Sequence, residues 1–245
     1  MRPTGPGGGW APTLRRSVRL LREFRHEPVD PARFYTALAD DSVQMLDHYA
    51  PLEDTALLDV GGGPGYFRNA FEQAGVRYYS VDVEDSDLPG ASGNRVIGSG
   101  MQLPFRTGSF DIAYSSNVLE HVVDPWQMAE EMLRVVRPGG LVFISYTVWY
   151  GPWGGHETAP WHYFGGMRAR RRYVRKLGRE PKNRFGESLF GVTVVDGIHW
   201  ARRQRGGQVL DITARYNPGW SHVLLRIPFL REVTTWNLVI VLQRH

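Results

Sequence analysis

A glycine-rich turn between an expected strand and an expected helix constrains this chain more than any other feature of its sequence. The apolar run at 56–60 leads directly into Gly61, Gly63 and Gly65, and a helical pattern continues over 66–74. Glycines have no Cβ, so they let the backbone N–H groups before a helix approach a ligand closely. The turn therefore predicts a binding site for something flat or anionic.

The next expected strand ends on an acid and so narrows the class of ligand. Residues 77–82 are rich in β-formers and finish at Asp82, about 20 residues beyond Gly61, where a carboxylate can bind the two hydroxyls of a ribose. Strand, helix and strand in this order form a βαβ unit, which favours a parallel sheet. The ligand is expected to be a nucleoside derivative.

The position of the third glycine distinguishes two classes of nucleoside cofactor. In the dinucleotide fingerprint G-x-G-x-x-G counted from Gly61, the last glycine would stand where this chain has Tyr66. The chain instead has Gly65, one residue earlier, in a G-x-G-x-G pattern. This spacing disfavours a nicotinamide-dependent oxidoreductase.

Further motifs follow in order, and with the glycine turn they resemble the type 11 branch of the class I S-adenosylmethionine-dependent methyltransferases over residues 50–147. This branch includes quinone-biosynthesis and many natural-product methyltransferases. The resemblance implies an α/β, Rossmann-like fold with a seven-stranded, mostly parallel sheet and S-adenosylmethionine bound across the carboxyl ends of the strands. The motifs are Leu103-Pro104-Phe105, Gly108-Ser109-Phe110-Asp111, Ser116-Asn117-Val118-Leu119-Glu120-His121-Val122, and Glu131-Met132-Leu133-Arg134-Val135-Val136-Arg137-Pro138-Gly139-Gly140.

The same resemblance implies which residues bind the cofactor. The methionine moiety is expected near the glycine turn, the ribose on the acid that ends the second strand, and the adenine beside residues that follow the second and third strands. Where the family commonly has an Asp for the adenine amino group, this chain has Ser99, so altered adenine contacts are expected. The expected cofactor-binding residues are Asp59, Gly61, Gly63, Gly65, Asp82, Val83, Gly100, Met101, Ser116 and Asn117.

The chain length of 245 residues suits one α/β domain with one core. Within it we expect N-terminal helices, a cofactor-binding core, an insertion that covers the acceptor side as a lid, and closing strands. An antiparallel hairpin is expected from the apolar segments of 222–243 around Pro228. The boundaries are a mobile tail at 1–11, helices at 12–50, the core at 51–148, the insertion at 149–205 and the closing strands at 206–245.

Composition excludes several kinds of site and partner. Cysteine is absent, so disulfides, thiolate metal sites and a cysteine nucleophile are excluded. The sequence shows neither a signal peptide nor a membrane span, and we expect a cytoplasmic protein. The formal charge of +4 is too small to indicate a particular partner. The Arg-rich segment 168–184 is interpreted as a solvated helix face, and no nucleic acid is expected to bind. The oligomeric state stays open.

Histidines near the expected methyl group are the candidates for catalysis. Methyl transfer from a sulfonium needs a base mainly when the acceptor is a hydroxyl, which must lose its proton during attack. His156 and His162 lie in the insertion, where Glu157 could orient a neighbouring imidazole, and His121 follows the fourth strand. A zinc-protease site is excluded, because Pro160 stands where the pattern H-E-x-x-H requires its second histidine. No metal ligands are predicted, and whether a divalent ion helps to bind a diol acceptor stays open.

Taken together, these residues predict a methyltransferase for a small-molecule acceptor, with O-methylation of a sugar-containing or natural-product metabolite favoured. Carbon or nitrogen methylation of a small molecule is the alternative within the same class. A regulatory protein that binds the cofactor without turnover is the alternative outside that class.

Overall fold

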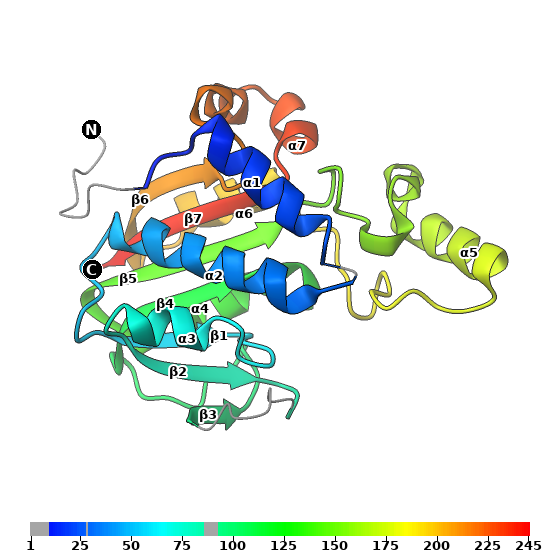
Figure 1. Cartoon of the computed structure of the whole chain (residues 1–245). Helices are drawn as coiled ribbons and strands as arrows, with labels where there is room; N and C mark the ends of the chain where they lie inside the picture. Colours follow the sequence, from blue (N-terminus) through cyan, green and yellow to red (C-terminus); the bar gives the residue numbers. More distant parts are fainter. Residues whose placement is uncertain (1–9, 28, 86–92) are drawn as a thin grey trace.

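A seven-stranded sheet in the order β3-β2-β1-β4-β5-β7-β6 forms the centre of the computed structural model, which describes residues 10–27, 29–85 and 93–245 (Figure 1). Strands β1 to β5 pair in parallel, and β7 lies antiparallel between β5 and β6. The predicted fold class is confirmed. The strands are β1 (Ala56–Val60), β2 (Arg77–Asp82), β3 (Asn94–Ile97), β4 (Phe110–Ser116), β5 (Val136–Thr147), β6 (Gly207–Ala214) and β7 (Asn237–Arg244).

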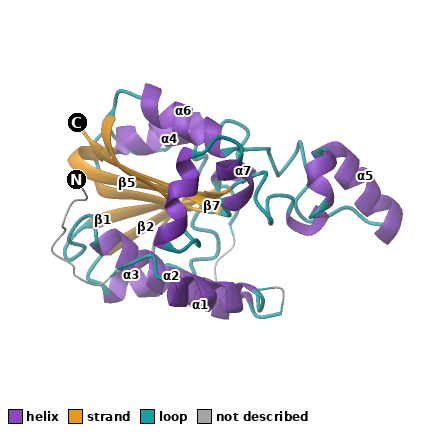
Figure 2. Cartoon of the chain, turned by 90° about the horizontal axis from the view of Figure 1, so that it is seen from above, coloured by secondary structure: helices purple, strands orange, loops and turns teal. Residues whose placement is uncertain are grey.

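Helices cover both faces of this sheet, which explains why its central strands are apolar runs without alternation (Figure 2). α1, α2 and α3 lie on one face, and α4 and α6 lie on the other. The helices are α1 (Leu14–Phe24), α2 (Pro31–Asp47), α3 (Arg68–Gln73), α4 (Pro125–Val135), α5 (Gly166–Leu177), α6 (Val194–Arg203) and α7 (Leu230–Thr234). Short 3₁₀ turns are η1 (Leu119–His121), η2 (His156–Thr158), η3 (Trp161–Phe164) and η4 (Gly219–Arg226). None of the helices in the described ranges is both long and apolar enough to cross a membrane.

The order of the strands fixes where a ligand can bind. β1 pairs with β2 on one side and with β4 on the other, so the chain leaves the carboxyl ends of β1 and β4 in opposite directions. A crevice forms at such a switch point in an open α/β sheet. The glycine turn after β1 and the segment after β4 both border it.

The C-terminal part of the chain differs in detail from the sequence prediction. The antiparallel hairpin exists, but its strands are β6 and β7, not two strands within 222–243. Residues 219–234 instead form η4 and α7, and Pro228, which has no N–H to give to a ladder, lies between them. The mobile tail predicted at 1–11 falls mostly outside the described residues.

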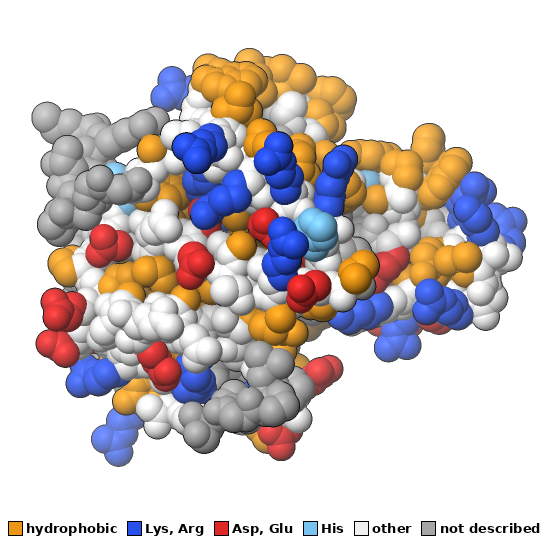
Figure 3. All heavy atoms as spheres, viewed as in Figure 1, with side chains coloured by type: hydrophobic (Ala, Val, Ile, Leu, Met, Phe, Trp, Pro, Cys, Tyr) orange, Lys and Arg blue, Asp and Glu red, His pale blue; other side chains and the backbone are white. Residues whose placement is uncertain are grey.

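The insertion is more regular than its composition indicates. Residues 194–203 form α6, whose Ile198 and Ala201 are buried in the core against the sheet, so this part is not a lid. The first part of the Arg-rich segment 168–184 lies in α5, which ends at Leu177, and the rest is loop. This segment belongs to the lobe that extends from the domain, and Figure 3 shows Lys and Arg side chains spread over that lobe. Arg170 pairs with Glu180 and Glu187, each at 2.8 Å.

A buried ionic network fastens the N-terminal helices to the sheet. Arg16 of α1 donates two hydrogen bonds to Asp41 of α2, at 2.6 and 2.7 Å. Arg215, which follows β6 and is fully buried, has its Nε 3.7 Å from the same carboxylate and donates to Ser42 and to Ser116 at the end of β4. Buried charges require such partners, because an unpaired one is costly.

Asp41→Asn is expected to destabilise the fold by about 3 kcal/mol, because it leaves two buried guanidinium groups with no counter-ion. Equilibrium denaturation with urea measures the change. Glu23→Gln is the matched control, since it breaks the exposed pair with Arg33 and should change stability little. Equal losses in the two variants would contradict this account of the network.

Candidate active site

The glycine turn after β1 has a backbone that only glycine adopts readily. Gly61, Gly63 and Gly65 have φ angles of 81°, 52° and 89°, in the left-handed region. A Cβ on Gly61 would also lie 2.5 Å from a methyl carbon of Val118, which follows β4. A Cβ on Gly63 would meet nothing within 4 Å, so this part of the turn faces open space.

Asp82 at the end of β2 is held beside this turn. Its Oδ2 accepts a hydrogen bond of 2.8 Å from the Gly63 N–H, and its Oδ1 accepts one of 3.1 Å from the N–H of Glu84. Arg95 of β3 donates to the Gly63 carbonyl at 3.1 Å. The turn and the acid that the sequence singled out are therefore adjacent, and Asp82 remains partly exposed there.

Asp59 lies inside the sheet, directly behind the turn. Burial raises the pKa of its carboxyl group to about 7, the hydrogen bond from Tyr78 lowers it, and the charge of Asp82 raises it. The Tyr78 hydroxyl donates to Oδ2 at 2.5 Å, and Asp59 is 2% exposed. Its Oδ2 lies 3.2 Å from the position that a Cβ on Gly62 would take, so Asp59 packs against the turn.

The other predicted cofactor residues border the same edge of the sheet. Val83 follows Asp82 and is exposed, whereas Gly100 packs so closely on Met128 and Val60 that a side chain there would crowd them. Ser99 accepts the Met101 N–H with its hydroxyl at 3.2 Å, so the residue that departs from the family pattern orders its own loop.

The last two of these residues lie at the end of β4. The Ser116 hydroxyl accepts from Arg215 at 2.8 Å. Asn117 has a φ of 56° and its side-chain oxygen accepts from Asn237 at 2.8 Å.

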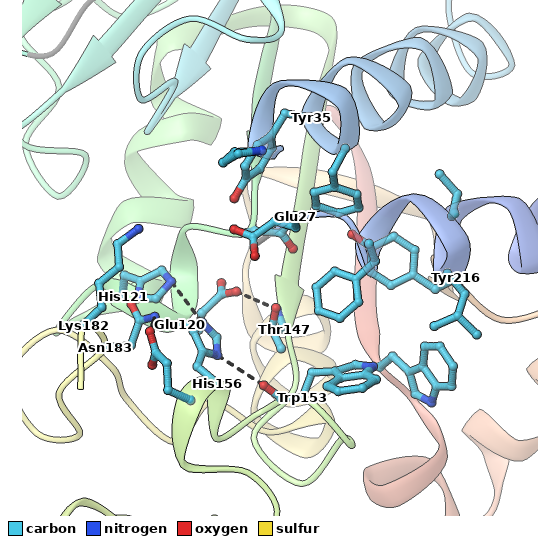
Figure 4. Close-up of a pocket in the computed structure, with 18 residues that line it drawn as sticks. Glu27, Tyr35, Glu120, His121, Thr147, Trp153, His156, Lys182, Asn183 and Tyr216 are labelled. Atoms are coloured by element: carbon cyan, nitrogen blue, oxygen red, sulfur yellow. Dashed lines mark hydrogen bonds between the residues drawn. The ribbon is translucent and has the colours of Figure 1, made fainter. Parts of the chain in front are cut away.

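A cavity of about 640 Å³ lies between α1, α2, the carboxyl ends of β4 and β5, and the insertion (Figure 4). Asn117 lines it, so it adjoins the strand end where the predicted cofactor residues finish. Its apolar wall includes Leu20, Leu21, Phe24, Phe34, Trp153 and Trp236. Its polar side includes Glu27, Glu120, His121, Thr147, His156, Glu157 and Lys182.

Two imidazoles and a carboxylate form the polar centre of this cavity. The Nε2 atoms of His121 and His156 are 3.4 Å apart, although these residues come from η1 and η2. Glu120 is 2% exposed, and one of its oxygens accepts the Thr147 N–H at 3.0 Å. Burial lowers the pKa of the His156 imidazole; the charge of Glu120 raises it and that of His121 lowers it.

The structure separates the histidines that the sequence grouped together. His162 is fully buried, its Nε2 is 3.2 Å from the Gly151 carbonyl, and it packs edge-on against Trp149 instead of lining the cavity. Glu157 lines the cavity, but its carboxylate accepts a hydrogen bond from Asn183. Glu120 was missed as a candidate, although the motif Leu119-Glu120-His121 contains it next to a histidine that was named.

Comparisons with known proteins show that this chain is similar to methyltransferases. The family described as "Methyltransferase domain" matches residues 58–144. An uncharacterized methyltransferase of Mycolicibacterium paratuberculosis is 51% identical over 244 residues, which cover 94% of this chain and 95% of the relative. One from Mycobacterium tuberculosis is 50% identical over 243 residues, with the same coverage of the two chains.

Solved structures show the same fold at low sequence identity. A chain from the Haloferax volcanii complex between the Trm112 methyltransferase activator and a methyltransferase superposes with a TM-score of 0.56 at 14% identity, covering 94% of this chain and 97% of that one. An S-adenosylmethionine-dependent methyltransferase from Mesorhizobium loti gives a TM-score of 0.56 at 16% identity, covering 84% and 98%.

The chain belongs to the class I S-adenosylmethionine-dependent methyltransferases, in the type 11 branch that its motifs resemble. It is an enzyme, and its cofactor is S-adenosylmethionine. The turn fits this cofactor, because Gly63 opens onto free space beside the partly exposed carboxylate of Asp82.

The raised pKa of Asp59 predicts how stability depends on pH. In the unfolded chain this carboxyl ionises near pH 4, whereas in the folded protein it keeps its proton until about pH 7. Stability is therefore expected to fall as the pH rises through this window, by on the order of 2 kcal/mol between pH 5 and pH 8. Asp59→Asn should remove that part of the loss in denaturation experiments at both pH values. An unchanged pH dependence would contradict it, and Asp40→Asn, at an exposed site on α2, is the control.

Proposed function

We propose that this methyltransferase transfers its methyl group to a hydroxyl oxygen of a small molecule bound in the cavity. The observation that carries the proposal is the polar centre of Glu120, His121 and His156 in a cavity that borders the end of β4. A hydroxyl must lose its proton during attack, and these groups accept protons. A neutral amine acceptor has less need of such proton-accepting groups, because its nitrogen attacks through a free lone pair.

The roles of the cofactor-binding residues follow from their positions. We assign the ribose hydroxyls to Asp82, the methionine moiety to the turn from Gly61 to Gly65 with Asp59 behind it, and the adenine to Val83, Gly100 and Met101. Ser116 and Asn117 then stand between this site and the cavity. When bound, the cofactor supplies an electrophilic methyl group, which needs no activation by the protein.

The chain's own residues then have to align the acceptor and exclude water. In-line displacement forms the O–CH₃ bond as the S–CH₃ bond breaks, so the oxygen has to be held in line with the sulfonium. The aromatic side chains of Phe24, Phe34, Trp153 and Trp236 present an apolar wall, which suits a flat or apolar body. The favoured acceptor is a hydroxylated natural-product metabolite, with sugar-containing compounds within the class.

The ribose assignment predicts that Asp82→Ala weakens the binding of S-adenosylhomocysteine by about tenfold to a hundredfold, the equivalent of hydrogen bonds to a charged group. Isothermal titration calorimetry measures the affinity. Asp40→Ala, which removes an exposed carboxylate from α2, should bind as the parent protein does. Parent-like affinity in Asp82→Ala would show that the ribose lies elsewhere.

The proposed acceptor chemistry predicts that Glu120→Gln and His156→Gln each lower kcat by about a hundredfold, while the affinity for S-adenosylhomocysteine is retained. Extracts of the host organism, incubated with the protein and methyl-labelled S-adenosylmethionine, provide the acceptor, and mass spectrometry locates the labelled methyl. His199→Gln, an exposed histidine on α6, is the control. Full activity in both variants, or a label on nitrogen or carbon, would refute the proposal.

A further inference from the structure

The two imidazoles in the cavity are held in matching tautomers. The Nδ1 of His121 lies 2.7 Å from the carbonyl oxygen of Ser188, and the Nδ1 of His156 lies 3.2 Å from that of Trp153. A carbonyl oxygen only accepts, so each Nδ1 carries the hydrogen and donates it. Each Nε2 is then a bare lone pair, and the two lone pairs face each other across 3.4 Å (Figure 4). Two lone pairs in this position repel unless a proton or a metal ion lies between them.

The third group supplies a negative charge at the same point. Glu120 is 2% exposed, and while Oε1 accepts the Thr147 N–H, Oε2 has no hydrogen-bond partner in the part of the chain that the structure describes. One ligand atom from each of the three residues lies within 4.8 Å of the other two. Burying a carboxylate oxygen without a partner is costly, so a positive charge bound beside Glu120 would stabilise the cluster.

We propose that Glu120, His121 and His156 bind a divalent transition-metal ion, for which zinc is the best match. Two imidazole nitrogens with one carboxylate oxygen form a common three-ligand set for catalytic zinc, which leaves a further position open to water or substrate. Zinc–nitrogen bonds of about 2.0–2.1 Å in a tetrahedron place two nitrogens about 3.3 Å apart, close to the observed separation of 3.4 Å. The carbonyls on both Nδ1 atoms are the outer partners that metal-binding histidines normally have.

The role of the ion in catalysis rests on the proposed function. With the ion bound, the three residues would act as ligands, and the ion in their place would promote the loss of the hydroxyl proton. All three ligand residues line the cavity, so an acceptor hydroxyl bound there could reach the ion. Zinc held by these three residues would act as a Lewis acid, which would lower the pKa of an acceptor hydroxyl beside it and release the hydroxyl proton to solvent. The acceptor oxygen would then bond to the methyl carbon as the carbon–sulfur bond breaks, which would yield a methyl ether and S-adenosylhomocysteine.

The ligands also connect two parts of the chain that lie apart in the sequence. Glu120 and His121 belong to η1, directly after β4, whereas His156 belongs to η2 in the insertion. A metal ion here would therefore fasten the insertion to the cofactor core. Since it binds the folded state only, it should raise the melting temperature.

Metal binding can be tested on the full-length protein without cofactor or acceptor. After chelator treatment and dialysis, Co²⁺ is expected to bind with one equivalent per chain and to give visible absorption bands typical of nitrogen and oxygen ligands. Zn²⁺ should displace it and raise the melting temperature, whereas Mg²⁺ at the same concentration should not. Glu120→Ala and His156→Ala should each weaken Co²⁺ binding at least tenfold, with His199→Ala as the matched control.

The outcomes separate this inference from the proposed function. If the parent protein gives no Co²⁺ bands and no melting shift with Zn²⁺, the imidazoles share a proton instead and the metal site is refuted, whether or not the variants fold. If the metal binds but the labelled methyl is found on nitrogen or carbon, the site stands and O-methylation fails. If the metal-free enzyme makes the methyl ether at full rate, O-methylation stands and the catalytic role of the metal fails.

Discussion

The left-handed backbone of the turn after β1 is the constraint on which the rest of the site depends. Only glycine adopts it without strain, and it aims the Gly63 N–H at the carboxylate of Asp82. The turn therefore joins the ends of β1 and β2 beside the switch point, which lies between β1 and β4. The crevice beside it is a consequence of this topology, and the segment after β4 that carries Glu120 and His121 forms the opposite side.

The side of the cavity that α1 and α2 form depends on a second feature, the buried ionic network around Asp41. α1 and α2 are attached through Asp41 to Arg16 and Arg215, and Arg215 also donates to Ser116 at the end of β4. The helices that supply Leu20, Phe24 and Phe34 to the apolar wall are thus fixed to the same strand end that borders the cofactor site. The shape of the acceptor cavity and the stability of the domain rest on one charge network.

Elements that depend on a local sequence pattern could be predicted from the sequence. Contacts between residues far apart in the chain could not. Strands β1 and β2 occur at the predicted residues, because apolar runs bounded by glycines and an acid are local signals. Helix α3 begins at Arg68, two residues late, since the turn extends through Phe67. The segment of α6 carries Trp, His and Arg, so its helical period was obscured, and only the structure shows that it packs on the sheet. His156 lies in an irregular part of the insertion. No periodicity there indicates which histidine lies beside His121 in the cavity.

The central claim is that the cofactor and the polar centre of the cavity meet at one point, next to Asn117. A crystal structure with S-adenosylhomocysteine bound tests it most directly. The ribose is predicted on Asp82, with the sulfur directed past Asn117 towards Glu120, His121 and His156 and with space for the acceptor hydroxyl between the sulfur and these residues. A sulfur directed away from these three residues, or separated from them by ordered protein, would contradict it.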